Sequence, residues 1–256
     1  MNLWDKYNLK NNKYYFFKIG YLNLWIHKKD EEWFIGYKYD TEHHYNFLKD
    51  VKKPENIEWN QYLVSNTESN IEIKPSLPDK PLLINSKYDL YILPKSENIY
   101  FTDIPAFITI NLVSTNESIE LLSIPTKILS KTWVGNPSSE NGVVSYSLTS
   151  KLYKTYEESR NNPVSIVVPL KIQNNSLTPF NFTALNIENR FLSIFQKENT
   201  FLTETISFNI KKNNQVNIRL NKDIYKDKNA TLIKAPIDKM ERNLLEKSFK
   251  ILKNIK

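Results

Sequence analysis

The sequence predicts an all-β protein built of sandwich-like antiparallel sheets, in one elongated or two small modules, with a C-terminal amphipathic helix. Two observations predict the strands. Aromatic and β-branched residues alternate near the N-terminus, and short apolar runs recur later at intervals typical of sandwiches. The helical spacing of apolar residues after Pro236 predicts the helix. A chain of 256 residues is long enough for either arrangement.

Residues 14–39 are expected to form three strands, with breaks at Gly20 and at residues 27–32. In the second strand, Leu22, Leu24 and Ile26 alternate with the residues between them, and alternation of this kind places one set on each face of a strand. In the third, every second residue from Trp33 to Tyr39 is apolar or aromatic, which indicates a shared face. A meander is therefore predicted.

Residues 40–70 are polar and weakly patterned, and residues 74–81 contain three prolines. Proline at this density excludes a helix, so the segment is expected to be a loop or extended linker. It marks the predicted boundary between an N-terminal β module (1–80) and a C-terminal β-sandwich module (81–235), which the helix (236–256) follows.

The second module is predicted from a series of short apolar runs. An Asn141-Gly142 pair before alternating residues is the strongest hairpin signal, because both residue types tolerate positive φ. The predicted strands cover residues 90–93, 106–113, 119–124, 143–148, 164–173, 184–187, 191–195, 205–210 and 216–220.

A helix is expected to begin at Pro236, where a missing N–H costs nothing, and to run toward Ile255. Its apolar residues project onto one half of a helical wheel and its lysines onto the other. Three interpretations remain open: docking on the sheets, binding a partner groove, or peripheral contact with an anionic membrane through residues 236–256.

Composition excludes several classes of protein. The chain has no cysteine, so it has no disulfides, thiolate nucleophiles or cysteine metal sites, and a reducing compartment is permitted. Its 4 glycines are scattered, which excludes glycine-rich phosphate loops. No signal-peptide pattern and no spanning apolar run occur, so a cytoplasmic location is expected.

The positive charge is confined to one part of the chain. Residues 211–256 carry 13 Lys/Arg against 5 Asp/Glu, a net charge of +8, whereas residues 1–210 carry 22 against 23. A basic tail on a nearly neutral body is not the footprint of a nucleic-acid-binding surface, and no specific nucleic-acid partner is predicted.

Four segments of the chain form a recognisable set in their order and spacing: residues 19–26 (IGYLNLWI) with Glu32-Trp33, residues 77–81 (LPDKP), residues 133–137 (WVGNP) with Gly142 and Tyr146, and residues 168–176 (VPLKIQNNS). Together they resemble the prokaryotic family called domain of unknown function 432, over nearly the whole chain. The resemblance implies no established activity, ligand or catalytic residue.

Candidates for catalysis are few. His43 and His44 beside Asp40 and Glu42 suggest a metal cluster, although adjacent residues on an extended chain point to opposite sides. The paired acids at residues 31–32 and 157–158 lack the fixed separation that a glycosidase needs, and solvated turns explain them. No catalytic residue, metal ligand or cofactor is predicted.

Two features suggest binding. The aromatic stripe consists of Trp25, Trp33, Tyr37 and Tyr39, and the first three rings could stack on a sugar, although large rings at period two more often form a core. The second feature is the loop that follows Trp133, since loops on rigid scaffolds often carry function; its candidate residues are Trp133, Gly135, Asn136, Asn141 and Gly142.

The function predicted is that of a non-catalytic intracellular binding or scaffold protein that recognises another protein, through the loop at residues 134–142 and the basic helix. Two alternatives remain. One is a ligand-binding domain of the carbohydrate type that uses the aromatic stripe. The other is a metal-dependent hydrolase built around His43 or His44.

Overall fold

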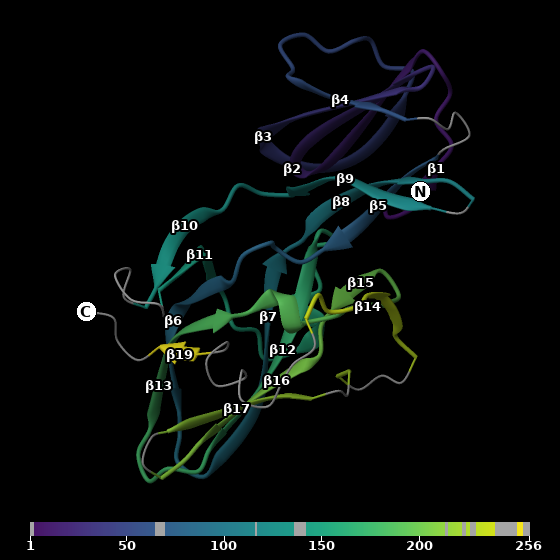
Figure 1. Cartoon of the computed structure of the whole chain (residues 1–256). Coiled ribbons are helices and arrows are strands. Elements are labelled where there is room, and N and C mark those ends of the chain that lie inside the picture. Colours follow the sequence, from purple (N-terminus) through teal and green to yellow (C-terminus); the bar gives the residue numbers. More distant parts are fainter. Residues whose placement is uncertain are drawn as a thin grey trace. The chain divides into compact units, whose positions relative to one another are not determined.

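The computed structural model describes residues 3–64, 70–115, 117–135, 142–212, 215–221, 224–225, 229–238 and 250–252. Strands dominate throughout, so the all-β prediction is confirmed (Figure 1). The chain divides into two compact units, and the first of them is discontinuous. Unit 1 comprises residues 1–76 and 106–128, and unit 2 comprises residues 77–105 and 129–256.

The expected boundary near residue 80 lies close to the point where the chain enters unit 2, but residues 106–128 return to unit 1. Two strands of unit 1 come from this returning segment; the first pairs with a strand from before the boundary, and the second pairs with the first. No local composition signal marks such a return, because the pairing that causes it is between residues far apart in sequence.

Unit 1 contains two sheets whose apolar faces form its core. Buried isoleucines of β5 and β8 line sheet A, and Tyr7 packs edge-on against Phe17 of sheet B. Sheet A has the order β1 (Lys6–Tyr7), β5 (Asn70–Ser76), β8 (Phe107–Val113) and β9 (Ser118–Pro125); sheet B has the order β2 (Lys13–Lys29), β3 (Glu32–Lys49) and β4 (Trp59–Leu63).

Strand β2 is longer than expected, because Gly20 does not end a strand. The register with β3 shifts between Gly20 and Leu22, which identifies a β-bulge, and Gly20 has a φ of 62°. The bulge lets Phe17 and Ile19 face the same core as Leu22 and Leu24. The predicted alternation is correct, but the first two of the three expected strands are one.

Strand β3 likewise extends beyond the prediction, through Lys49, and β4 follows, so residues 40–70 are not simply a linker. The turn between β2 and β3 is the two-residue Asp30-Glu31, with Lys29 opposite Glu32. The sequence does not predict this part of the strand, because the second half of β3 is mostly exposed and its residues are polar, with little apolar alternation.

Unit 2 contains a five-stranded and a seven-stranded sheet, and parallel pairs in both depart from the expected antiparallel arrangement. Sheet C has the order β10 (Ser130–Val134), β11 (Val143–Ser150), β6 (Leu82–Ile92), β13 (Phe180–Ile187) and β19 (Lys250–Leu252). Sheet D contains β17 (Val216–Asn221), β16 (Thr205–Ile210), β12 (Ser165–Asn174), β15 (Thr200–Leu202), β14 (Ile194–Lys197) and β18 (Thr231–Lys234), with β7 (Ser96–Pro105) also paired to β12.

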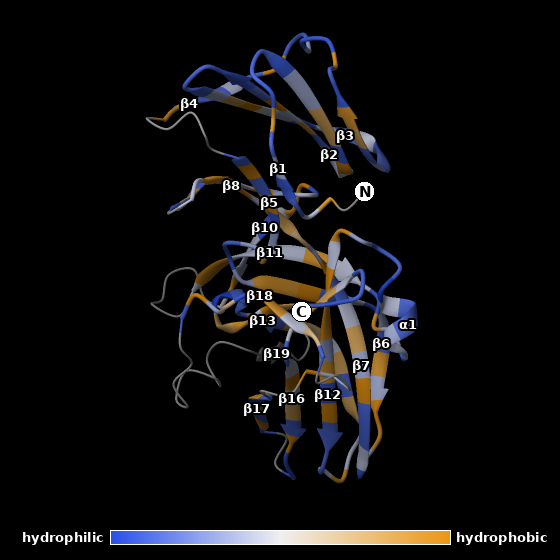
Figure 2. Ribbon diagram, turned by 90° about the vertical axis from the view of Figure 1, so that its right-hand side faces the viewer, coloured by the Kyte–Doolittle hydropathy of each residue, from blue (hydrophilic) through white to orange (hydrophobic). Residues whose placement is uncertain are grey.

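The central strand β12 changes character along its length. Residues 165–170 are buried on both faces, and from Lys171 onward the outer side chains are partly exposed, while Ile172 and Asn174 remain buried. Figure 2 shows apolar stretches along β12 and the neighbouring β7. One half of β12 therefore belongs to the interior, and the other half offers a polar outer face.

The described residues contain two short helical segments, α1 (Tyr156–Ser159) and the 3₁₀ turn η1 (Asn189–Phe191). None of the helices in the described part of the chain has the length and apolar composition needed to span a membrane.

The predicted C-terminal helix is not supported. Residues 250–252 form strand β19, which pairs antiparallel with β13, and Ile237 is three-quarters exposed and not on a buried face. Residues 239–249 and 253–256 lie outside the described residues. A helical spacing of apolar residues is overridden here because sheet C offers an edge on which this segment forms backbone hydrogen bonds.

Candidate functional site

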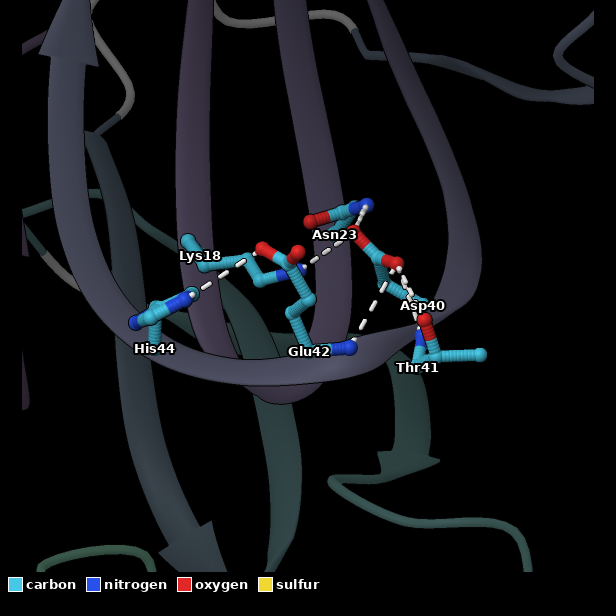
Figure 3. Close-up of polar contacts among 6 residues, drawn as sticks. All are labelled: Lys18, Asn23, Asp40, Thr41, Glu42 and His44. Carbon is cyan, nitrogen blue, oxygen red and sulfur yellow. Dashed lines mark hydrogen bonds and ion pairs between the residues drawn. The ribbon is translucent and has the colours of Figure 1, made fainter.

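The histidine and carboxylate cluster that suggested a metal site lies in unit 1, in a wide bulge of β3. Gly20 pairs with His44 and Leu22 with Tyr39, so residues 40–43 oppose the single residue Tyr21. His44 Nε2 lies 3.3 Å from Glu42 Oε2 (Figure 3). His43 Nε2 lies 3.2 Å from the Tyr45 hydroxyl. The two imidazoles therefore have separate partners.

Asp40 forms hydrogen bonds with residues other than the two histidines. Its carboxylate accepts hydrogen bonds from Lys18 Nζ at 2.8 Å and from the Thr41 N–H at 2.7 Å. The Lys18 hydrogen bond, with help from the Thr41 N–H, holds the pKa of Asp40 well below its usual range. The third histidine, His27, stacks on Tyr14 at 4.0 Å. Among the described residues, no three His, Asp or Glu side chains are grouped to hold a metal.

The aromatic stripe divides between the two faces of sheet B. Trp33 and Tyr37 share a face with Leu24 and Ile26, since Tyr37 pairs with Leu24 and Ile35 with Ile26, whereas Trp25 pairs with Gly36 on the opposite face. Trp33 has no exposed surface, and Trp25 and Tyr37 are half-buried. The three rings therefore do not form one platform for a sugar.

The other paired acids are also structural. Glu157 and Glu158 are exposed in α1, where Thr155 caps the helix by accepting the N–H of Glu158 at 3.3 Å. Glu32 accepts a hydrogen bond from Gln61 Nε2 at 3.0 Å, beside exposed Glu31. Each pair therefore takes part in local hydrogen bonds near a helix end or a strand end.

The hairpin of β10 and β11 carries the remaining candidates. Val134 pairs with Val143, so residues 135–142 form the connecting loop, and a hairpin at this place is confirmed. Gly135 is exposed and Gly142 half-exposed, while Asn136 and Asn141 lie outside the described residues. Trp133 is 50% exposed, in contrast to the buried Trp33.

Trp133 shares one face of the hairpin with three other side chains, those of Lys131, Val144 and Tyr146. Lys131 is directly opposite Tyr146, and Trp133 is opposite Val144, so all four side chains lie on one face of the hairpin. On the other face, Val134 packs with Leu83 and Ala184. The hairpin is thus fixed to sheet C from behind, while Trp133 faces outward.

The loop at residues 77–81 supports the same face. The Tyr146 hydroxyl donates to Asp79 Oδ1 at 2.8 Å, Lys80 pairs with Asp79, and the Lys80 Nζ lies 5.5 Å from the centre of the Tyr146 ring. Burial alone would raise the pKa of Asp79, but the hydrogen bonds from Lys80 and Tyr146 outweigh burial and lower that pKa. Asp79 is therefore an anion that fixes both neighbours.

The backbone of this loop is held as well. The Tyr146 N–H donates to the Pro81 carbonyl at 2.8 Å, and the buried Asn189 amide donates to the carbonyls of Pro78 and Lys80. We name the surface of Asp79, Lys80, Lys131, Trp133 and Tyr146 the hairpin face. The period-two spacing of Val144 and Tyr146 could have placed Tyr146 beside Trp133, but nothing local indicated that the loop at residues 77–81 reaches it.

Comparison with known proteins gives one result. No curated protein and no solved structure is similar enough to the chain to give a match. The model of the family described as "Protein of unknown function (DUF432)" matches residues 3–253, which is nearly the whole chain. The chain therefore belongs to this family.

Proposed function

We propose that the protein is a non-catalytic, cytoplasmic binding protein that recognises another protein, and that it does so at the hairpin face. The observation that carries the proposal is the half-exposed Trp133 on a strand at the edge of a sheet. The lack of cysteine suits a reducing compartment, which supports the cytoplasmic part of the proposal.

An exposed tryptophan on a rigid support is the type of residue that dominates binding energy at protein interfaces. Trp133 has such a support, because Val134 beside it is buried with Leu83 and Ala184. Across the hairpin, Tyr146 is held by Asp79 and Lys80. Little conformational freedom is then lost when a partner covers the indole, which favours affinity.

The edge of β10 suggests how the partner binds. Strand β10 ends the order of sheet C and pairs only with β11 among the described residues, so its outer backbone N–H and C=O groups have no strand beside them. An edge of this kind accepts an extended peptide as an additional strand, with backbone hydrogen bonds for affinity and side-chain pockets for specificity.

The charged side chains of the hairpin face indicate what kind of partner segment would fit it. Lys131 is exposed two residues before Trp133 and on the same face, whereas Lys80 is already paired with Asp79. A partner strand with an acidic side chain opposite Lys131 and an apolar one against Trp133 would complement the hairpin face. The proposed partner is therefore an extended, acidic segment of another protein.

The test is site-specific crosslinking in cells, with a photoreactive phenylalanine at position 133 and, as control, at Tyr88, which is also exposed in unit 2. The partner captured from position 133 alone is then purified and its affinity measured. We expect Trp133→Ala to weaken binding at least tenfold and Tyr88→Ala to leave it unchanged, in keeping with the free energy that tryptophan contributes at interfaces.

Two results would contradict the proposal: the same proteins crosslinked from both positions, or a purified partner that binds the Trp133→Ala variant as tightly as the wild-type protein. Proline substitution at Lys131 tests backbone pairing separately. The Tyr146 N–H points to the Pro81 carbonyl, so the Lys131–Tyr146 pair exchanges no backbone hydrogen bonds and the Lys131 N–H points away from the sheet. If backbone pairing at β10 contributes, Lys131→Pro should weaken binding more than Lys131→Ala without unfolding unit 2, since proline is tolerated on an edge strand where the missing N–H would face outward.

A further inference from the structure

A polar groove of about 250 Å³ lies in unit 2, on the outer face of β12, β16 and β17. The three strands lie side by side in Figure 2. In β16 the side chains alternate from Ile206 onward, because Ile206, Phe208 and Ile210 are buried while Ser207 and Asn209 line the groove. The groove is therefore a surface of hydrogen-bonding side chains over an apolar sheet interior.

The strand registers arrange these side chains in two rows across the sheet. Lys171 pairs with Ser207 and Ser207 with Arg219, so these three form the cationic row. Gln173 pairs with Asn209 and Asn209 with Asn217, which gives a parallel row of amides. Adjacent strands are about 4.8 Å apart, so the backbones of Lys171 and Arg219 are about 10 Å apart, with Ser207 between them.

The charge of the cationic row is only partly neutralised. Glu97 of β7 lies 2.8 Å from Lys171 Nζ and takes up part of that charge. Arg219 is exposed, and no carboxylate of the described residues forms an ion pair with it. A guanidinium offers a planar set of donors that suits phosphate and carboxylate oxygens.

The hydrogen bonds within the groove leave donors facing outward. Asn221 Nδ2 donates to Ser207 Oγ at 2.9 Å, so the Ser207 hydroxyl proton is available for another acceptor. Asn209 Nδ2 donates to Gln173 Oε1 at 3.3 Å, and Asn175 Nδ2 donates to Asn209 Oδ1 at 2.9 Å. Gln173 Oε1 is therefore occupied as an acceptor, and the Gln173 side-chain nitrogen can donate to a ligand.

From this arrangement we infer that the groove binds the phosphate group of a small hydroxylated molecule of the sugar phosphate class. The phosphate oxygens accept hydrogen bonds from Arg219 and Ser207 with Lys171 beside them, and the hydroxyls of the ligand meet the row of amides. An acceptor-rich anion is the complement of a site made of two cations, a hydroxyl donor and an amide donor. A groove of this size suits a ligand smaller than a typical drug molecule.

This site is separate from the hairpin face, so either proposal can fail without the other. The test is calorimetric titration of the full chain with three probes: glucose 6-phosphate, inorganic phosphate and glucose. We expect glucose 6-phosphate to bind more tightly than inorganic phosphate, and both to bind at least tenfold more tightly than glucose.

Variants locate the binding. Arg219→Gln and Ser207→Ala should each weaken glucose 6-phosphate binding, the first at least tenfold, because a charge-assisted hydrogen bond contributes about twice as much as a neutral one. Lys154→Gln removes an exposed cation of the same unit outside the groove and should change nothing. Thermal unfolding of each variant checks that it is folded.

Three results would overturn the inference. No heat of binding with either phosphate compound at millimolar concentration would remove the site. Equal affinity for inorganic phosphate and glucose 6-phosphate would remove the sugar and leave only a phosphate. Unchanged binding in Arg219→Gln would place any binding elsewhere.

Discussion

The two units differ in how they use their charged and aromatic side chains. In unit 1, Lys18 has a side chain only 8% exposed, and its ammonium is bound to Asp40 (Figure 3). In unit 2, Arg219 stands exposed on the outer face of β17. Two of the three candidate tryptophans differ in the same way, since Trp33 is enclosed by unit 1 and Trp133 is half-exposed on unit 2.

Exposure is the property that distinguishes the polar cluster of unit 1, which is structural, from the proposed binding surfaces of unit 2. Next to Lys18 and Asp40, the side-chain oxygen Oδ1 of Asn23 has no hydrogen-bond partner. It is also buried, so a ligand could not reach it. The groove of unit 2 combines remaining donors with access. Substitutions in the unit 1 cluster should therefore alter stability, whereas those in the unit 2 surfaces should alter binding.

The largest effect expected is that of Trp33→Ala. Removing a fully buried indole leaves a cavity and should lower the free energy of unfolding by about 3–5 kcal/mol. Urea denaturation followed by circular dichroism measures the change. Trp133→Ala is the matched control, and an exposed site should cost no more than about 0.5 kcal/mol. Equal costs at both positions would abolish the contrast between the units.

A second test adds one methyl group to the face of sheet B opposite Leu24 and Ile26, where Gly36 is covered by Ile57 and Trp59. A Cβ at Gly36 would lie 2.5 Å from Ile57 Cγ2 and 3.1 Å from Trp59 Cε3, so Gly36→Ala should destabilise unit 1 by about 1–3 kcal/mol. Because Ile57 is the side chain nearest to the added methyl group, truncating Ile57 provides the control. In an Ile57→Ala background the added methyl group has room, and Gly36→Ala should then cost clearly less; an undiminished cost would mean that backbone contacts dominate.

The Lys18–Asp40 pair should appear in the pH dependence of stability. The Lys18 hydrogen bond lowers the pKa of Asp40 in the folded protein, so the unfolded chain takes up this proton first as the pH falls. The contribution is complete above the ordinary aspartate pKa of about 4 and is lost progressively below it.

Melting temperatures measured from neutral pH into the acid range test this dependence. Asp40→Asn should flatten the acid part of the curve. Asp50→Asn should not, because Asp50 and Lys13 form an exposed pair at 3.4 Å, and exposed pairs contribute little. A curve for Asp40→Asn that parallels the wild-type curve would show that the pair does not stabilise unit 1.

The smallest effect expected on stability is that of Arg219→Gln. Its side chain is exposed, and no described carboxylate pairs with it, so the free energy of unfolding should change by no more than about 0.5 kcal/mol. Chemical denaturation without added phosphate measures this value. A loss comparable to that of Gly36→Ala would mark Arg219 as a structural residue and undermine the contrast with Lys18.

Much of the fold followed from local pattern. The alternation of Leu22, Leu24 and Ile26 appears in β2, and the hairpin expected before Val143 joins β10 to β11. Where the local signal was weak or misleading, the prediction failed. The polar second half of β3 resembled a linker, and the helical spacing after Pro236 did not prevent a strand at residues 250–252.

The candidate site was predictable only in part. Trp133 was named from its place before a loop, and its exposure fits that choice. Grouping Trp25 with Trp33 failed, because the face that each ring takes depends on the register between β2 and β3. Tyr146 and the loop at residues 77–81 meet only because β11 pairs with β6, far away in sequence.

The sequence by itself determined the class of fold, the absence of cysteine chemistry and glycine-rich phosphate loops, and the strands whose side chains alternate. These are local properties, since backbone geometry imposes a period of two on every strand. Tertiary structure alone decided the rest: the return of residues 106–128 to unit 1, the burial of Trp33, and the alignment of Lys171, Ser207 and Arg219 in one row. These features depend on pairing between distant strands, and hydrogen-bond register over such distances leaves no periodic signal in the sequence.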